Sequence, residues 1–144
     1  MLEGRGQKIV VVDNDRTVLE LLQIRLEVAG YHAHIVRTGA QALDLLKHLH
    51  PAAMILDLRL ADTDSFDLLQ TIRARHPDQH FPILATGRGL VADDLRRALS
   101  AGAQNCLIKP YSGTDAVERV GRLIQACHFP GAHAIELTKP RAVA

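Results

Sequence analysis

The stretch Met54-Ile55-Leu56-Asp57 decides the fold, because an apolar run ends there in a single carboxylate. Three other apolar runs also end in a polar or charged side chain. Residues 9–12 run into Asp13-Asn14-Asp15, residues 83–85 into Thr86, and residues 106–108 into Lys109-Pro110. Short apolar runs separated by longer helical patterns are typical of parallel strands buried on both faces. Ligands bind beyond the carboxyl ends of such strands, so these four endings are predicted to share one crevice.

Strands and helices are predicted to alternate along the chain. Strands are expected at residues 8–12 and 31–36, followed by strands that end at Asp57, Thr86 and Lys109. The second of them alternates polar and apolar side chains, which favours a position at the edge of the sheet. Five strand–helix units of this kind predict an α/β fold, in which helices cover both faces of one parallel sheet.

The helices are predicted from apolar residues at helical spacing. Their inward-facing residues are expected to be Leu19, Leu22, Leu26 and Ala29 before a stop at Gly30; Ala42, Leu45, Leu46 and Leu49 before Pro51; Leu68, Leu69 and Ile72; Val91, Leu95, Ala98 and Leu99 between a loop with Gly87 and Gly89 and a stop at Gly102; and Val117, Val120, Ile124 and Cys127. The predicted caps are Thr38 with Gln41 as a capping box, Asp64 or Ser65, and Ser112 or Thr114.

The composition indicates one globular domain. The chain has 144 residues, is 47% hydrophobic and 23% charged, and carries a formal net charge of +1. This charge argues against a nucleic-acid partner. No apolar stretch approaches the roughly 20 residues that span a bilayer, and the start lacks the apolar core of a secretion signal. We therefore expect a cytoplasmic protein without membrane contact, whose two cysteines, Cys106 and Cys127, are reduced and buried. The predicted divisions are a flexible leader at 1–7, one domain at 8–127, and a linker or loose tail at 128–144 with a candidate docking strand at 134–137.

The predicted crevice has the parts that phosphoryl transfer requires. Carboxylates at neighbouring strand ends need a cation, and an open set of oxygen ligands favours Mg²⁺. A carboxylate beside such a metal can act as a nucleophile toward a phosphoryl group. The transferred group gathers negative charge, which an ammonium and a hydroxyl can stabilise. Asp13, Asp57, Thr86 and Lys109 supply these groups.

The chain resembles the receiver domain of bacterial two-component response regulators (CheY-like) over about residues 8–127. The matching pieces are Val-Asp-Asn-Asp at 12–15, Ile-Leu-Asp-Leu at 55–58, the strand end at Thr86, and Gly102-Ala103 leading to Leu-Ile-Lys-Pro-Tyr at 107–111. This resemblance implies the strand order 2-1-3-4-5, with the alternating second strand at an edge. It also implies a cis peptide bond between Lys109 and Pro110.

The resemblance also implies a function in signalling rather than enzyme catalysis. Asp57 would accept a phosphoryl group from the phosphohistidine of a histidine kinase or phosphotransfer protein, and Thr86 and Lys109 would bind the phosphoryl oxygens. The implied Mg²⁺ ligands are Asp13, Asn14, Asp57 and the backbone carbonyl of Arg59. A downstream protein would bind the face formed by the fourth helix, the last strand and the last helix.

Among the positions that depart from the pattern of this family, Asn14 and Cys106 bear most directly on function. Asn14 stands where a second acid usually contacts the metal, which should weaken Mg²⁺ binding, and Asp15 is a candidate to compensate. Cys106 stands at the switch position, where an aromatic side chain usually swings inward after phosphorylation. Tyr111 is a candidate substitute. The alternative hypothesis is that the signal is read through changes in the backbone and loop at residues 86–92.

Arg59 and Arg88 lie two residues beyond Asp57 and Thr86. They are interpreted either as solvated loop residues or as modulators of the phosphoryl lifetime.

Other functions remain as alternatives. Asn14 and Cys106 favour a phosphorylation-independent adaptor with the receiver fold, and Mg²⁺ affinity separates the two, because an adaptor needs no metal. The sequence at 87–92 fits the dinucleotide-binding pattern G-x-G-x-x-A. That pattern also requires an acidic residue at the end of the following strand, which this chain lacks, so nucleotide binding is not favoured. The pairs His32/His34 and His48/His50 are interpreted as surface histidines rather than metal ligands. Asp93-Asp94 is explained by the dipole of the helix that it begins.

Overall fold

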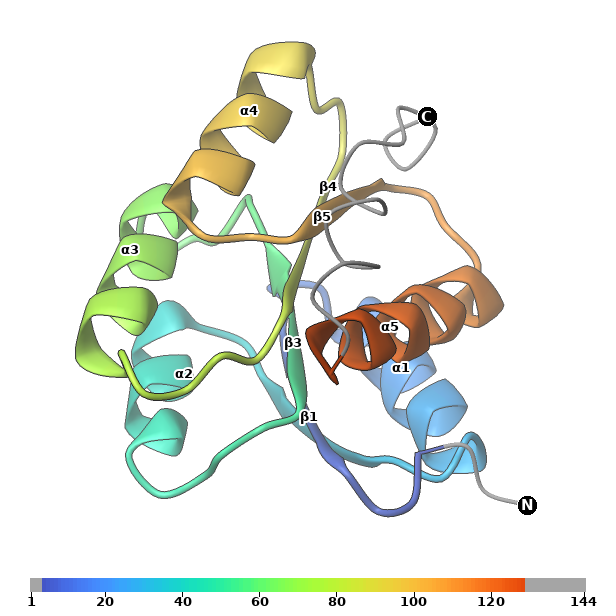
Figure 1. Cartoon of the computed structure of the whole chain (residues 1–144). Helices are drawn as coiled ribbons and strands as arrows, with labels where there is room; N and C mark the ends of the chain where they lie inside the picture. The colour runs from blue at the N-terminus through green and yellow to red at the C-terminus, as the bar shows by residue number, and fades with distance from the viewer. Residues whose placement is uncertain (1–3, 129–144) are drawn as a thin grey trace.

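A computed structural model describes residues 4–128 of the chain as a parallel sheet between two layers of helices (Figure 1). The strands are β1 Lys8–Val12, β2 His32–Val36, β3 Ala53–Asp57, β4 Ile83–Gly87 and β5 Asn105–Ile108. The helices are α1 Arg16–Val28, α2 Gly39–Leu46, α3 Ser65–Arg75, α4 Ala92–Ala101 and α5 Gly113–His128. All five predicted strand–helix units are therefore present.

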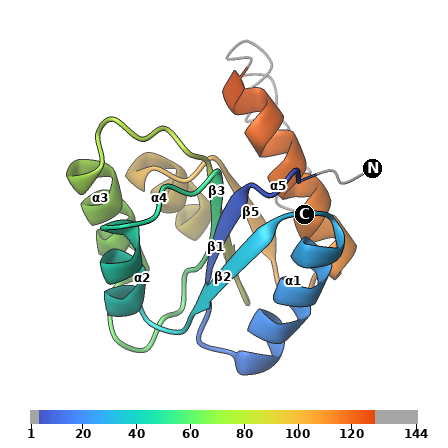
Figure 2. The same cartoon turned by 90° about the horizontal axis from the view of Figure 1, so that it is seen from below.

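The strand order is β2-β1-β3-β4-β5, as the resemblance implied, and β2 lies at an edge. Helices α1 and α5 cover one face, and α2, α3 and α4 cover the other (Figures 1 and 2). The parallel register pairs Val12 with Leu56 and Asp57 with Thr86. This register matters for the site, because the residues that follow β1 and end β3 and β4 reach the same edge of the sheet.

The core has two parts, one on each face of the sheet. Val10 and Leu56 face the side of α2–α4, whereas Val11 and Ile55 face α1 and α5. This alternation follows the two-residue period of a strand. All five residues of β3 are buried, which explains why its sequence is continuously apolar up to Asp57.

Polar side chains begin four helices. Asp15 caps α1 by accepting the Thr17 N–H, and Asp64, rather than Ser65, caps α3 by accepting the N–H groups of Phe66 and Asp67. The other observed caps are Thr38 on the Gln41 N–H and Ser112 on the Asp115 N–H. Only half of the predicted capping box forms, because the Gln41 carboxamide accepts the Arg37 N–H instead of the Thr38 N–H.

The predicted inner face of α4 is partly wrong. Val91 and Leu99 are 61% and 41% exposed, and the helix is buried mainly through Ala98 and Ala101. These small residues allow α4 to lie close to the sheet, so the larger residues on either side of them stay in solvent. The predicted loop at Gly87 is also wrong, because Gly87 is the last residue of β4.

The prediction that Cys127 is buried is wrong as well. Both cysteines in the described part of the chain are free, but only Cys106 is buried. The Cys127 thiol donates to the carbonyl oxygen of His80 at 2.8 Å. The last turn of α5 thus meets the segment before β4 rather than the sheet, which leaves this thiol uncovered.

Part of the predicted leader contacts the domain. The N–H groups of Gly4 and Gly6 donate to the carbonyl oxygens of Ala29 and Gly30 at 2.8 and 2.7 Å. Residues 4–7 are therefore held at the end of α1. The division into leader, domain and tail stays a prediction, and the candidate docking strand at 134–137 lies outside the described residues.

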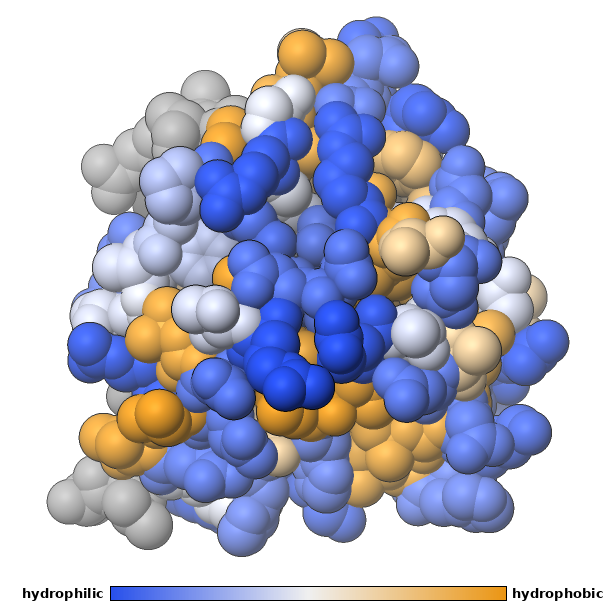
Figure 3. All heavy atoms as spheres, turned by 180° about the vertical axis from the view of Figure 1, so that it is seen from behind, coloured by the Kyte–Doolittle hydropathy of each residue, from blue (hydrophilic) through white to orange (hydrophobic). Residues whose placement is uncertain are grey.

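The surface carries few large apolar side chains. The rear face is mostly hydrophilic, with apolar atoms in separate patches (Figure 3). Among the described residues, no helix is both long and apolar enough to cross a membrane. Within the part of the chain that the structure describes, the exposed large hydrophobic residues are Leu21, Ile24, Val28, Val91 and Leu99.

Candidate functional site

Three charged side chains meet beyond the carboxyl ends of β1, β3 and β5. The Lys109 Nζ lies 2.8 Å from Asp13 Oδ2 and 3.2 Å from Asp57 Oδ2. None of the three side chains is more than 8% exposed. The strand register explains this meeting, because Asp13 directly follows β1, Asp57 ends β3, and Lys109 directly follows β5. The predicted meeting of these strand-end side chains is therefore present, and the two acids share one ammonium group.

Backbone groups fix the other carboxylate oxygens. The Asp15 N–H donates to Asp13 Oδ1 at 2.8 Å, and the Arg59 N–H donates to Asp57 Oδ1 at 3.0 Å. The Ser65 hydroxyl donates to the Asp57 carbonyl oxygen at 2.8 Å, which holds the end of β3 to the start of α3. Each acid is therefore oriented by two contacts, and Asp57 is held at both its backbone and its side chain.

The site has an excess of negative charge. Burial raises the pKa of Asp57, and the neighbouring Asp13 charge raises it further, against the effects of the Arg59 N–H and of Lys109. Burial alone would lower the pKa of Lys109, but hydrogen bonds and charge from Asp13 and Asp57 outweigh it, so its pKa lies above the usual value. Lys109 therefore stays protonated, and one ammonium group faces two carboxylates.

Thr86 places a hydroxyl beside this cluster. It pairs with Asp57 in the register of β3 and β4 and is fully buried. Within residues 4–128, its Oγ1 has no hydrogen-bond partner. A buried hydroxyl without a partner is costly and needs an explanation. A ligand bound at Asp57 would supply the missing partner.

Tyr111 lies near the acids but belongs to the core. Burial raises the pKa of its phenol, and the charges of Asp13, Asp57 and Asp15 raise it further. The ring packs against the core on the α1 and α5 side, and its hydroxyl has no hydrogen-bond partner within the described part of the chain. The phenol is therefore protonated at neutral pH. Its position supports a packing role more directly than a switching role.

The oxygen groups at this edge fit a hard divalent cation. Asp13 and Asp57 together have more negative charge than Lys109 neutralises, and Mg²⁺ binds to few carboxylates while keeping several waters. Asn14 is exposed beside them. Asp15 uses one oxygen to cap α1, which limits its value as a substitute ligand. Among the described residues, no group of three or more His, Cys, Asp or Glu side chains lies close enough together to hold a metal.

The two arginines proposed as modulators differ in their surroundings. Arg88 is exposed and forms no ion pair with any residue that the structure describes. Arg59 is 55% exposed at its side chain, and its Nη2 lies 3.6 Å from Asp94 Oδ2. The sequence explained Asp94 only by the helix dipole, and this pairing was missed.

Asp62 is a second residue whose contacts were missed. Its two oxygens accept the Gly39 and Ala40 N–H groups at 3.0 and 3.2 Å, which lowers the pKa of the carboxyl. The loop after Asp57 is thereby tied to the first turn of α2. No sequence spacing could show this contact, because the bonded residues are 23 and 22 positions apart.

Comparison with known proteins identifies the family. A sequence model described as the response regulator receiver domain matches residues 9–121. The chain belongs to the response regulator receiver domain family. The residue pattern that suggested this family is thus confirmed as a family relationship, and the order of strands and helices is that of its fold.

Individual relatives agree with this assignment. The DNA-binding response regulator MtrA of Mycobacterium tuberculosis is 32% identical over 119 residues, which cover 83% of this chain and 51% of MtrA. The chain thus spans about half the length of the curated relatives it matches. A solved receiver domain of a histidine kinase from Syntrophus aciditrophicus is 26% identical, with a TM-score of 0.75 over 84% of this chain and 92% of that one.

A further solved structure supports the fold alone. A CheY-like receiver domain protein from Methanospirillum hungatei is 21% identical, with a TM-score of 0.80 over 88% of this chain and 99% of that one. At 21% sequence identity, this similarity supports a shared fold but not a shared function. Together the comparisons place the chain among the receiver domains of response regulators.

We predict that Asp57→Asn stabilises the receiver by about 1 kcal/mol at neutral pH. The pKa of Asp57 is raised above 3.8, so the folded state favours the protonated acid. Protonated Asp57 therefore stabilises the folded wild-type protein. This stabilisation is fully present below the pKa that Asp57 has in the unfolded chain, and it is lost as the pH rises through the pKa that Asp57 has in the folded protein. The stability difference between variant and wild type should therefore be largest near pH 7 and shrink as the pH falls. Urea unfolding in EDTA measures it, with the exposed Asp44→Asn as control, and an unstabilised variant at pH 7 would contradict this account.

Proposed function

We propose that this receiver accepts a phosphoryl group on Asp57 from the phosphohistidine of a histidine kinase or phosphotransfer protein. The observation that carries the proposal is the cluster in which Asp57 and Asp13 share Lys109 beside the unpartnered Thr86 hydroxyl. A structural ion pair would need only one acid and no free hydroxyl. Phosphoryl transfer needs the second acid and the free hydroxyl, because the transferred group brings three oxygens and additional negative charge.

The chemistry assigns a separate role to each side chain. A carboxylate oxygen of Asp57 attacks phosphorus, the bond from phosphorus to the donor imidazole breaks, and its electron pair returns to the nitrogen. The Lys109 ammonium and the Thr86 hydroxyl bind phosphoryl oxygens as their charge grows. Mg²⁺, when bound, would neutralise the acids and the incoming oxygens. Its proposed ligands are Asp13, Asn14, Asp57 and the backbone carbonyl of Arg59.

Intact mass spectrometry tests this proposal. The receiver is incubated with acetyl phosphate and Mg²⁺, beside Asp57→Asn and a sample in EDTA. We expect wild type to gain one phosphoryl group, and the variant and the EDTA sample to gain none. A wild type that stays unmodified at high Mg²⁺, while remaining folded, would reject the proposal and favour a phosphorylation-independent adaptor.

The adaptor remains the second candidate because of two particular residues. Asn14 supplies a neutral amide at the mouth of the site, and Cys106 offers no aromatic side chain at the switch position. An adaptor needs no metal, whereas the phosphoacceptor requires it. Mg²⁺ affinity therefore distinguishes the two candidates without a kinase.

We predict that Asn14→Asp tightens Mg²⁺ binding on the order of tenfold, because affinity rises with the charge of the ligand set. Isothermal titration of wild type and variant measures the change. Asp57→Asn serves as the opposing control and should weaken binding. Equal affinities in wild type and Asn14→Asp would show that residue 14 does not contact the ion.

The proposed output is protein contact through the face formed by α4, β5 and α5. Exposed Val91 and Leu99 on and beside α4 offer apolar contacts there. We propose a cytoplasmic receiver that itself binds neither nucleic acid nor membrane, and that has at most intrinsic self-phosphorylation and dephosphorylation activity. The relative MtrA is described as a DNA-binding response regulator, but MtrA is about twice as long as the region that matches this chain.

A further inference from the structure

Arg59 contacts two separate parts of the receiver. Its backbone N–H donates to Asp57 Oδ1 at 3.0 Å, while its guanidinium Nη2 lies 3.6 Å from Asp94 Oδ2 in the first turn of α4. The same Asp94 oxygen accepts the Val91 N–H at 3.0 Å and so closes the start of that helix. One residue therefore joins the carboxylate of Asp57 to the first turn of α4.

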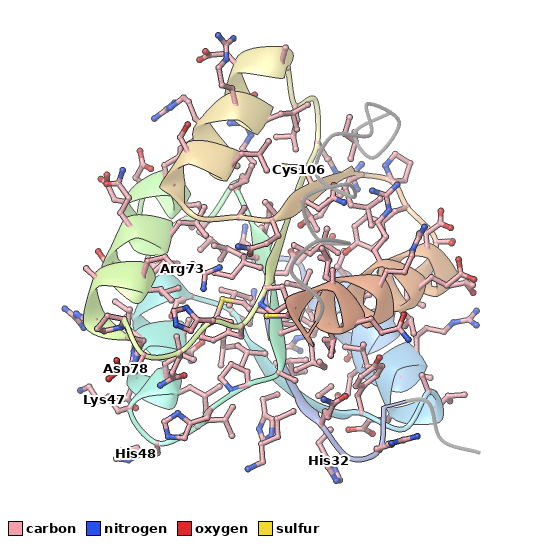
Figure 4. The ribbon with its side chains drawn as sticks, viewed as in Figure 1. His32, Lys47, His48, Arg73, Asp78 and Cys106 are labelled. Atoms are coloured by element: carbon pink, nitrogen blue, oxygen red, sulfur yellow. The ribbon has the colours of Figure 1, made fainter. Side chains whose placement is uncertain are left out.

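The side chain at position 106 offers no comparable connection. Cys106 is 1% exposed and packs within the core beside α4 (Figure 4). Burial raises the pKa of its thiol to about 11, so the group is neutral at physiological pH. It has neither a charge nor a large ring that could change position when Asp57 is modified. A signal that reaches α4 must use other contacts.

The ion pair between Arg59 and Asp94 is suited to exchange partners. At 3.6 Å, with side chains 55% and 16% exposed, it is a weak surface pair. A phosphoryl group on Asp57 would carry roughly two negative charges. Arginine binds phosphate oxygens through two parallel hydrogen bonds, a geometry that a single distant carboxylate oxygen does not offer.

Open space borders Arg59 and Asp94. A cavity of about 280 Å³ lies between the loop after β3 and the start of α4, and Arg59, Ser65, Asp94 and Arg97 are among its lining residues. The second arginine holds a different contact, because the Arg97 guanidinium stacks 4.0 Å from the centre of the Phe66 ring. Arg59 can therefore leave Asp94 while the contact between Arg97 and Phe66 still joins α4 to α3.

We propose that the Arg59–Asp94 pair is a latch, which phosphorylation of Asp57 opens by drawing the Arg59 guanidinium toward the phosphoryl oxygens. This inference rests on the proposed function. Opening leaves Asp94 with the Val91 N–H alone and loosens the first turn of α4. Val91, which is 61% exposed, is the side chain through which a partner would detect the change.

Amide NMR with a phosphoryl mimic tests the latch. Asp94→Asn keeps an oxygen for the Val91 N–H but removes the charge that holds Arg59. Asp93→Asn is the matched control, because it removes the same charge one residue earlier, where Asp93 pairs with Arg96 at 3.4 Å. Each protein is recorded with Mg²⁺, before and after addition of beryllium fluoride.

We expect the amides of residues 91–95 to shift on addition of the mimic in wild type and in Asp93→Asn. In Asp94→Asn these amides should already lie near the bound positions, and the change should fall at least twofold. Arg59→Gln, altered on the other side of the pair, should behave like Asp94→Asn. Equal changes in all four proteins would overturn the latch.

The amides of Asp57 and Thr86 report occupancy of the site independently. Shifts at these two residues, with the same response at residues 91–95 in every variant, would reject the latch and leave the proposed function intact. The absence of shifts at Asp57 and Thr86 in wild type would reject the proposed function, and the latch with it.

Discussion

Replacing Lys109 with methionine should slow phosphorylation of Asp57 by acetyl phosphate about 10²–10³-fold, the usual loss when one group that stabilises developing charge is removed. The Lys109 Nζ contacts both Asp13 and Asp57, and its side chain is only 8% exposed. Without it, the two carboxylates repel each other and the incoming oxygens meet no ammonium. The rate is measured as the appearance of the phosphorylated mass at saturating Mg²⁺.

Two variants control this result. Lys47→Met removes an exposed lysine that pairs with Asp44 on the surface, and it should leave the rate unchanged. Lys109→Arg keeps the charge but spreads it over a planar group, so it should recover only part of the rate. A Lys109→Met protein that is folded and phosphorylated within about twofold of the wild-type rate would show that Lys109 is only structural.

Replacing Arg73 with methionine should lower the free energy of unfolding by about 3 kcal/mol, because hydrogen bonds to a charged group are lost and buried acceptors remain. Arg73 extends from α3 toward the sheet (Figure 4). Its guanidinium donates to the carbonyl oxygens of Gly102 and Phe81 at 2.7 and 2.8 Å, and to Gln104 Oε1 at 2.9 Å. Burial lowers the pKa of this side chain, which nevertheless stays charged.

Urea unfolding measures the effect of Arg73→Met, with Arg75→Met as the matched control from the same helix turn. Arg75 is exposed, so its replacement should change stability by less than about 0.5 kcal/mol. Similar midpoints for the two variants would mean that Arg73 contributes no more than a surface residue. In that case, contacts other than Arg73 would have to hold α3 to the segment before β4 and to the start of β5.

Much of the fold follows from local sequence patterns. The continuous apolar run before Asp57 predicted a strand buried on both faces, and β3 is buried at every position. The alternation at 31–36 predicted an edge strand, and β2 is one. Because parallel strands end at the same edge, the pattern also predicted that Asp13, Asp57 and Lys109 meet, and they do.

Errors arose where tertiary packing overrides helical spacing. Leu99 has the period of an inward residue, yet it is 41% exposed, because the small Ala98 and Ala101 make the contact with the sheet. Cys127 has the period of Val120, but the turn that carries it meets His80 instead of the core. The spacing of apolar residues predicts which face of a helix turns inward, whereas the neighbouring element decides how much of that face is buried.

The long-range polar contacts outside this cluster of strand ends could not be predicted from the sequence. Arg73 binds the Gly102 carbonyl 29 residues away, and Asp62 caps α2 from 23 residues away. The pair of Arg59 and Asp94 likewise joins the loop after β3 to the first turn of α4, two segments that only the sheet topology brings together. Such contacts depend on which helices and loops become neighbours after folding, and a local sequence pattern does not show this.

The most direct test of the central claim is to locate the phosphoryl group on the chain. Borohydride reduces an aspartyl phosphate to homoserine, which is stable enough for peptide sequencing by tandem mass spectrometry. After treatment with acetyl phosphate and Mg²⁺, we expect homoserine at position 57 and at no other acid. Homoserine at Asp13 or Asp15 instead, or its absence from a protein that binds Mg²⁺, would contradict the assignment of Asp57 as the phosphoacceptor.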